Sequence, residues 1–377
     1  MEDRIMKINS LNMVGGFGQS IWLDYIRRDL IASGELGRLI REDALKGMTS
    51  NPAIFEKAIT GSNLYDADIR KMALQHKEIK EIYESLSQQD IQNAADVFRP
   101  VYEKTSGEDG YVSLEVNPHL AHSTKGSIQE GRRLWSLLKR PNVFIKIPAT
   151  TEGLIAIRQL ISNKINVNVT LIFSLTRYRQ VAEAYLEGLE ACVAKRSKID
   201  QITSVASFFL SRIDTLVDSE LEKIIESDSN NKDLAKETLG EVAISSAKAA
   251  YQIYKEIFNS PRFKKLEEKG AHVQRLLWAS TSNKNPAYSD VKYIEALIGP
   301  KTVTTVPLDT INAYRDHGNP KSRLEQDIEK ANRILKNLTV LGIDIDQATH
   351  LLENEGIQKF NEPFDKLMDA LKKKASA

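Results

Sequence analysis

Polar side chains interrupt several short apolar segments at every second position, which is the spacing of one face of a strand. In one such segment Leu114 and Val116 face one way, so Ser113, Glu115 and Asn117 face the other. Burying a neutral polar group costs roughly 1–3 kcal/mol unless it is hydrogen-bonded, and an ion costs more. We therefore interpret these polar faces as a functional interior.

The same alternation places a lysine among these polar groups. In the next apolar segment Ile145 and Ile147 would face outward, which leaves Phe144 and Lys146 inside. The other inward sets are Trp22 with Asp24, Thr49 with Asn51, and Asn166 with Asn168 and Thr170.

A buried lysine beside carboxylates is suited to carbonyl chemistry. The neutral amine attacks a ketone, the imine becomes a protonated electron sink, and a carboxylate moves the protons. One alternative is that Lys146 forms only a buried salt bridge with Glu115 or Asp24, although such pairs are weak stabilisers. Asp24 alone could instead cap the helix that follows it.

Eight segments with strand-like composition must position these residues. They alternate with amphipathic helical patterns, which favours a parallel sheet, and eight such units favour a closed barrel. No glycine-rich dinucleotide or phosphate loop follows any of them. The segments are residues 20–26, 47–52, 111–118, 143–148, 165–173, 202–209, 274–281 and 302–307.

The sequence thus predicts an α/β fold, a single (β/α)8 TIM barrel with helical insertions and a helical C-terminal extension. We expect one domain over residues 1–377, with the barrel core at about 20–320 and the extension at 321–377. The insertion at 53–110 shows helical patterns from Leu64 to Tyr83 and from Asp90 to Tyr102. The insertion at 210–273 is predicted to be two helices joined by a hinge at Ser227–Lys232.

Composition narrows the classes of function. The 377 residues contain 52 Lys and Arg against 51 Asp and Glu, so no overall field favours nucleic acid or an anionic membrane as a partner. No apolar run has the length of a signal peptide or a membrane span. The single cysteine, Cys192, excludes an internal disulfide, and we expect a cytoplasmic protein.

Other titratable residues are interpreted as structural. His119 and His122 lie close in sequence, but no third metal ligand stands out nearby, so we expect a surface loop and no metal. Cys192 is expected to be a packed thiol. Asp214 and Asp218 are four residues apart and are expected to lie on a solvated helix face rather than to bind a cation.

The chain resembles the transaldolase family at these strand segments. From about Ile21 to Pro307 the segments WLDYIRRDL, TSNPAIF, SLEVNP, VFIKIPAT, NVNVTLIFS, SFFLSRID and WASTSNKNPAYSD are similar to successive motifs of that family, and the length suits its longer bacterial subgroup. The resemblance implies transfer of a dihydroxyacetone unit between sugar phosphates in the pentose phosphate pathway. Sedoheptulose 7-phosphate and glyceraldehyde 3-phosphate would give erythrose 4-phosphate and fructose 6-phosphate. It implies no cofactor, and it leaves open a monomer or a homodimer.

Roles for the polar residues also follow from the resemblance. Lys146 corresponds to the imine-forming lysine, Glu115 and Thr170 to the pair that holds a catalytic water, and Asp24 to the acceptor of the C4 hydroxyl proton. The expected binding residues for the three-carbon unit are Asn51, Asn168, Ser207 and Phe209, with Thr49 in support.

The phosphate site departs from the family pattern. Arg212 corresponds to a bidentate phosphate arginine. Better-known members have a second arginine where this chain has Ser282, so we expect Lys284 to replace it, with Ser280 as a hydroxyl donor. A lysine is a point charge rather than a planar fork, so orientation of the phosphate would depend more on Arg212.

Three rival functions remain open at this point. An aldolase that releases free dihydroxyacetone would use the same lysine, although related aldolases commonly lack a carboxylate at the position of Glu115. A non-catalytic sugar-phosphate binding protein would be expected to have lost Lys146, Glu115 or Asp24. A metal-dependent aldolase would need ligands inside the barrel, where no histidine is expected.

Overall fold

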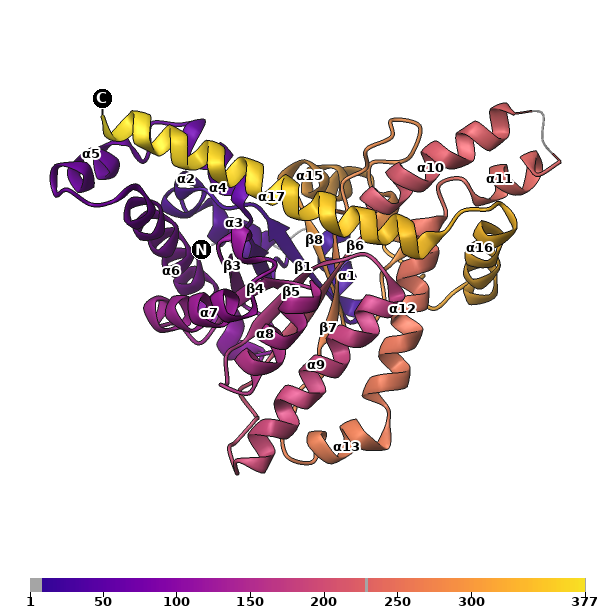
Figure 1. Ribbon diagram of the computed structural model, residues 1–377, viewed down its shortest axis with the longest axis horizontal. Coiled ribbons are helices and arrows are strands. Elements are labelled where there is room, and N and C mark those ends of the chain that lie inside the picture. Colours follow the sequence, from indigo (N-terminus) through magenta and orange to yellow (C-terminus); the bar gives the residue numbers. More distant parts are fainter. Residues whose placement is uncertain (1–8, 228–229, 377) are drawn as a thin grey trace, which may run out of the picture.

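Eight short parallel strands close into a barrel in chain order, so the predicted fold class is confirmed (Figure 1). The computed structural model describes residues 9–227 and 230–376. Pairing of β1 with β8, through partners such as Gln19 and Thr302, closes the barrel. The strands are β1 Gln19–Asp24, β2 Gly47–Thr49, β3 Tyr111–Glu115, β4 Val143–Pro148, β5 Val167–Ile172, β6 Ser204–Phe209, β7 Arg275–Ala279 and β8 Thr302–Val306.

Helices surround the strands and fill the long connections. Several begin at a side-chain cap that the sequence supplies, such as Ser123, Thr150 and Ser174. Those between strands up to β6 are α2 Arg28–Ala32, α3 Glu35–Glu42, α4 Pro52–Thr60, α5 Asp66–Leu74, α6 Ile79–Lys104, η2 Pro118–Leu120, α7 Thr124–Leu138, α8 Thr151–Ile161 and α9 Leu175–Ala194. The others are α1 Ser10–Val14, η1 Gly15–Phe17, α10 Ser211–Glu226, α11 Lys232–Thr238, α12 Val242–Phe258, α13 Pro261–Glu267, α14 Lys292–Ala296, α15 Leu308–His317, α16 Ile328–Val340 and α17 Ile345–Ala375.

Strand register aligns the polar residues that alternation had placed on the inner face. Glu115 of β3 pairs in register with Lys146 of β4, which in turn pairs with Asn168 of β5. Register partners on parallel strands point to the same side of a sheet. The predicted interior therefore becomes a layer of neighbouring side chains, near the carboxyl ends of β3 and β4.

Aromatic rings fill the barrel beneath this layer. Phe144 stacks on Tyr111 with ring centroids 4.3 Å apart and on Trp22 at 6.0 Å. All three side chains are buried. They separate the two ends of the barrel, so each end has its own polar chemistry.

The amino-terminal end of the barrel holds a buried ion pair whose carboxylate accepts further hydrogen bonds. Arg275 lies 2.9 Å from Asp109, and both side chains are buried. The carboxylate of Asp109 also accepts hydrogen bonds from Ser20 at 2.7 Å and from the indole of Trp22 at 3.1 Å.

The long insertions contain more helices than the sequence pattern predicted. In 53–110 the expected helix from Leu64 to Tyr83 is interrupted, because α5 ends at Leu74 and His76 takes a left-handed φ of 58°. The described residues of 210–273 form four helices instead of two. Residues 228 and 229 of the predicted hinge lie outside the described residues.

The C-terminal extension is helical, as predicted, and its last helix crosses the barrel. Figure 1 shows α17 as a long yellow helix lying over the strand ends. It contacts α4, α5, α6, α10 and β5. Glu353 pairs with Arg177 of α9 at 3.2 Å, and Asp365 pairs with His119 at 2.8 Å.

Candidate active site

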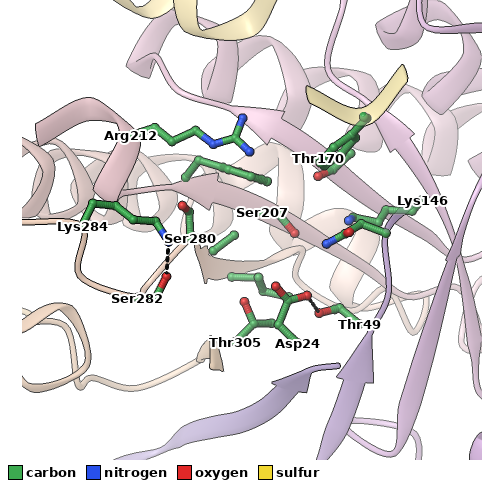
Figure 2. Close-up of a pocket in the computed structure, with 15 residues that line it drawn as sticks. Asp24, Thr49, Lys146, Thr170, Ser207, Arg212, Ser280, Ser282, Lys284 and Thr305 are labelled. Atoms are coloured by element: carbon green, nitrogen blue, oxygen red, sulfur yellow. Dashed lines mark hydrogen bonds between the residues drawn. The ribbon is translucent and has the colours of Figure 1, made fainter. Parts of the chain in front are cut away.

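A cavity of about 160 Å³ opens at the carboxyl ends of the strands, where barrel sites form. Ten of the twelve predicted site residues line it, and Figure 2 shows most of them converging from different strands. These ten are Asp24, Thr49, Asn51, Lys146, Thr170, Ser207, Phe209, Arg212, Ser280 and Lys284. Glu115 and Asn168 lie behind the lining and contact it.

Lys146 projects from β4 into the cavity. Its Nζ lies 3.3 Å from Oε2 of Glu115, and each side chain is only 5% exposed. The ammonium also donates a hydrogen bond to the carbonyl oxygen of Ser50 at 3.2 Å. The predicted neighbourhood of lysine and carboxylate is therefore present, and the ion pair that we considered as an alternative is part of it.

Glu115 is poised to exchange a proton near neutral pH. Burial raises the pKa of Glu115 to about 7, although the nearby charge of Lys146 opposes the rise. Its Oε2 accepts no hydrogen bond from any described residue, and the buried hydroxyl of Thr170 likewise has no partner among them. Two buried oxygens without a hydrogen-bond partner among the described residues fit a site that holds a water molecule.

Asp24 faces the cavity and does not cap a helix. The next helix, α2, has Arg27 at its N-cap position, without a capping side chain, so the capping alternative is wrong. Oδ1 of Asp24 instead accepts a 2.7 Å hydrogen bond from the hydroxyl of Thr49, its register partner on β2. Thr49 thus fixes the direction of the carboxylate, and among the described residues no hydrogen bond to Oδ2 competes with a ligand.

The two predicted asparagines have different surroundings. Asn168 is fully buried, accepting a 2.7 Å hydrogen bond from Ser207 and donating one to Ser113. Asn51 lines the cavity and caps α4, because its Oδ1 accepts the amide hydrogen of Ile54. Asn168 therefore orients Ser207, while the amide nitrogen of Asn51 is available to a ligand.

Two cations gather at the opposite end of the cavity from Lys146. Figure 2 shows Arg212 and Lys284 together on one side, with Ser280 and Ser282 below them. Burial lowers the pKa of both cations, and the charge of Arg212 lowers that of Lys284 further. Nη1 of Arg212 is buried and donates no hydrogen bond to any described residue. An anion here would satisfy that donor and relieve the repulsion between the cations.

Two strand ends at this cavity carry non-glycine residues with left-handed backbone. Leu171, next to Thr170, has φ of 59° at a register shift between β5 and β6, and Ser280 has φ of 54° after β7. Such conformations cost of order 1–3 kcal/mol and cluster at functional sites. The hydroxyl of Ser280 lies 2.9 Å from that of Ser211, which begins α10.

Comparison with known proteins decides the family. A family model described as Transaldolase/Fructose-6-phosphate aldolase matches residues 21–371. The chain belongs to this family. A transaldolase of Trichodesmium erythraeum is 50% identical over 98% of both chains. A transaldolase 2 of Nostoc punctiforme is 48% identical over 98% of both chains. A transaldolase of Thiobacillus denitrificans is 42% identical over 96% of this chain and 99% of its own. The resemblance inferred from the motifs is confirmed, and these relatives support a transferase of the transaldolase type.

One wall of this transaldolase-family site escaped the sequence analysis. Phe360 of α17 lines the cavity, and its ring centroid lies 5.3 Å from Nζ of Lys146. Thr305 of β8 is a second lining residue that was not predicted. Thr305 has the inward strand position that could have identified it, whereas Phe360 has the pattern of an ordinary packed helical residue.

Asp214 and Asp218 correct one expectation. They were expected on a solvated helix face, but both are buried. Asp218 accepts a 2.8 Å hydrogen bond from the hydroxyl of Tyr288, and Asp214 accepts one of 2.8 Å from that of Tyr293. Their partners lie on the chain after β7, so α10 ties Arg212 to the segment that carries Lys284.

His119, His122 and Cys192 have the exposure that the sequence analysis expected. His119 and His122 are exposed. Cys192 is buried, and burial raises the pKa of its thiol. Within residues 9–227 and 230–376 no three His, Cys, Asp or Glu side chains are grouped as metal ligands. No helix in the same part of the chain is long and apolar enough to cross a membrane.

Proposed function

We propose that this protein is a transaldolase that transfers a dihydroxyacetone unit between sugar phosphates through an imine on Lys146. The observation that carries the proposal is the buried contact between Lys146 and Glu115, in one cavity with a pair of cations at its other end. One end suits a ketone and the other a phosphate. We place the reaction in the pentose phosphate pathway of the cytoplasm, without a cofactor, in a single-domain chain.

Imine formation uses the lysine and the groups around it. Nζ of Lys146 attacks the ketone carbon C2 of the donor, and the carbinolamine then loses water. Glu115 shuttles the protons through a water held between its Oε2 and the hydroxyl of Thr170. A carboxyl with a pKa of about 7 can both give and take a proton at neutral pH, which both halves of this exchange require.

Cleavage uses the second carboxylate. Asp24 accepts the proton of the C4 hydroxyl, the C3–C4 bond breaks, and its electron pair moves into the iminium to give an enamine. The aldose phosphate leaves, an acceptor aldose phosphate enters, and the same steps run in reverse. Thr49 holds the oxygen of Asp24 that is not used. Separate carboxylates for the two proton transfers allow each to have its own environment.

Binding distributes the substrate along the cavity. Asn51, Ser207 and Phe209 surround the three-carbon unit, and Asn168 acts by orienting Ser207. Arg212 and Lys284 bind the phosphate, with Ser280 beside them. The neutral amides bind hydroxyl groups without adding charge near the cationic imine.

Trapping of the intermediate tests the proposal. The protein is incubated with fructose 6-phosphate, reduced with borohydride, digested and analysed by mass spectrometry. We expect a three-carbon adduct on the peptide that contains Lys146 and none in a Lys146→Ala variant. No adduct on a folded wild-type protein that binds fructose 6-phosphate would refute the imine mechanism.

The family name also includes a fructose-6-phosphate aldolase, so the second activity needs its own measurement. A transaldolase should form little free dihydroxyacetone from fructose 6-phosphate alone, and product should appear when erythrose 4-phosphate is added. Fast release of dihydroxyacetone without that acceptor would assign the chain to the aldolase side of the family.

A further inference from the structure

One wall of the cavity comes from outside the barrel. Phe360 belongs to α17, whereas the other lining residues lie on strand ends or on the segments that directly follow them. The Phe360 side chain is only 5% exposed, and its ring lies over Nζ of Lys146 at 5.3 Å from the ring centroid. Figure 2 draws a short yellow stretch of the C-terminal helix beside Thr170. The imine nitrogen would therefore form directly beneath an aromatic ring.

Close packing of α17 fixes this ring in place. Gly356 lies one turn before Phe360, and a Cβ added there would be only 3.0 Å from the side chain of Leu171 and 3.5 Å from Arg212. Phe364 lies one turn after Phe360 and packs edge-on against Tyr83 at 5.5 Å. Residues four apart share a helix face, so all three lie on the face that meets the barrel.

A salt bridge and a histidine–carboxylate hydrogen bond lie on either side of this stretch of helix. Glu353 pairs with Arg177 on one side of Phe360, and Asp365 pairs with His119 on the other. The Glu353 and Arg177 side chains are 11% and 16% exposed, so the first pair is largely shielded from solvent. The stretch of helix that carries Phe360 is therefore fixed to the rest of the protein on both sides of this residue.

The Phe360 ring matters at one branch point of the reaction. This inference rests on the proposed function. After cleavage the three-carbon unit remains on Lys146 as an enamine. Transfer needs an aldose carbonyl to react at C3. Release needs C3 to take a proton, water to add its oxygen to C2 of the iminium and lose a proton, and the C2–N bond to break as nitrogen takes a proton.

We propose that Phe360 is a specificity-determining residue that covers the imine and makes transfer to an aldose prevail over release of free dihydroxyacetone. Its ring lies over Nζ of Lys146 and limits the access of further water to the enamine, and therefore the protonation of C3 that release requires and transfer does not. Its π face also stabilises the cationic iminium at the nitrogen. The residue touches the reacting group but moves no proton itself.

The experiment measures a ratio rather than an activity. The full chain is given fructose 6-phosphate with and without erythrose 4-phosphate, and free dihydroxyacetone is compared with sedoheptulose 7-phosphate formed. In Phe360→Ala we expect the ratio of release to transfer to rise on the order of tenfold, which corresponds to about 1.4 kcal/mol, because water then reaches the enamine more readily. In Phe360→Leu, which keeps most of the bulk, the ratio should lie between those of Phe360→Ala and the wild type.

Phe364→Ala is the matched control. It removes a phenylalanine from the same helix face, but Phe364 packs on Tyr83 and does not line the cavity. Its ratio should equal that of the wild type. An unchanged ratio in Phe360→Ala, or an equal rise in both variants, would overturn the proposal. If Phe360→Ala does not fold, a wild-type ratio in Phe360→Leu would overturn it.

Borohydride trapping separates this proposal from the one on which it rests. If wild-type Lys146 is trapped as an adduct and the ratio does not depend on Phe360, only the role of the ring is wrong. If wild-type Lys146 is never trapped, the imine mechanism fails, and the role of the ring fails with it.

Discussion

Each end of the barrel buries an ion pair, and the two pairs are completed differently. At the amino-terminal end Asp109 contacts Arg275 at 2.9 Å and accepts two further hydrogen bonds. At the carboxyl end Glu115 lies 3.3 Å from Lys146, and its nearest oxygen accepts no hydrogen bond from a described residue. The carboxylate of Asp109, with its hydrogen bonds made, favours a fixed structure. The oxygen of Glu115 that accepts no hydrogen bond leaves room for a water or a substrate.

The pKa values of the two carboxyl groups move in opposite directions. Burial alone would raise both, and at Glu115 it prevails, bringing the pKa to about 7. At Asp109 burial is outweighed by Arg275 and the Ser20 hydrogen bond together, so its pKa falls below the ordinary value. The nearby charges and hydrogen bonds, acting together against burial, decide in which direction the pKa of each buried carboxyl moves.

Replacement of Lys146 should give the largest effect, and this effect should be on the turnover rate. We expect Lys146→Ala to lose turnover by on the order of 10⁴-fold or more, as when a covalent nucleophile is removed. Its free energy of unfolding should fall by less than the roughly 3–5 kcal/mol of an uncompensated buried charge, because burial lets Glu115 take up a proton. Initial rates and urea unfolding measure the two quantities.

Lys248→Ala is the matched control for that variant. Lys248 is also a buried lysine, but it donates to the carbonyl of Gln326 far from the cavity. Its turnover should equal that of the wild type. Comparable turnover in Lys146→Ala and Lys248→Ala would remove the distinction between the two kinds of buried lysine.

Asp109→Ala should give the converse result. Because Arg275 would be left buried without its partner, we expect the free energy of unfolding to fall by about 3–5 kcal/mol. Turnover per folded molecule should be unchanged, since Asp109 does not line the cavity. Glu108→Ala is the control, because that carboxylate is half-exposed and its pair with Lys301 should contribute about 0–1 kcal/mol. Equal losses in both variants would contradict the comparison.

Glu115→Gln should change how the free energy of unfolding depends on pH. A folded-state pKa raised from 4.5 to about 7 means that the folded protein binds an extra proton between these values, so wild-type stability falls as pH rises through them. This rise in pKa corresponds to a loss of about 3 kcal/mol of stability when Glu115 loses its proton. Glutamine has no such proton, so the variant should not show this loss. We expect the variant to gain on the wild type by about this amount from pH 4.5 to 8 in urea unfolding.

For Asp109 the expected change of stability with pH has the opposite sign. Its lowered pKa contributes stability above the ordinary value of 3.8, and that stability is lost as pH falls through the lower folded value. Asp109→Asn should therefore lose most relative to the wild type at neutral pH and least in acid. If both variants showed the same trend with pH, the contrast between the two carboxyl groups would be wrong.

The smallest expected effect compares the partly buried Arg212 with the buried Arg275. Arg212→Ala removes a donor that has no described partner, so we expect a change in stability within about 1 kcal/mol. Loss of a charged hydrogen bond to phosphate, about 1.5–3 kcal/mol, should raise the KM for fructose 6-phosphate about 10–100-fold. Arg275→Ala should instead lower stability and leave KM unchanged. A normal KM in Arg212→Ala would exclude it from the phosphate site.

The strands and their inner faces could be predicted because alternation is local information. Lys146, Glu115 and Thr170 are inward for the same reason that their apolar neighbours are outward, and register then follows from closure of the barrel. The order of the motifs along the chain identified the family. The roles assigned to individual residues remain predictions, which the variants above test.

Long-range contacts explain what the sequence analysis missed. Phe360 has the spacing of a packed helical residue. No local feature of the sequence indicates that its helix crosses the carboxyl end of the barrel. Asp214 and Asp218 were expected in solvent because a buried carboxylate has no local signature. Their partners Tyr288 and Tyr293 are 70 and 79 residues further along the chain.

The course of α17 also sets the order in which the site matures during synthesis. All eight strands are complete at Val306, whereas the ring over Lys146 arrives 54 residues later. At about 5–20 residues per second, the ribosome needs on the order of several seconds for that stretch. A nascent barrel would thus present a reactive amine to any small carbonyl compound before its cover exists. Discrimination between acceptors and water is then the last property that the newly made protein acquires.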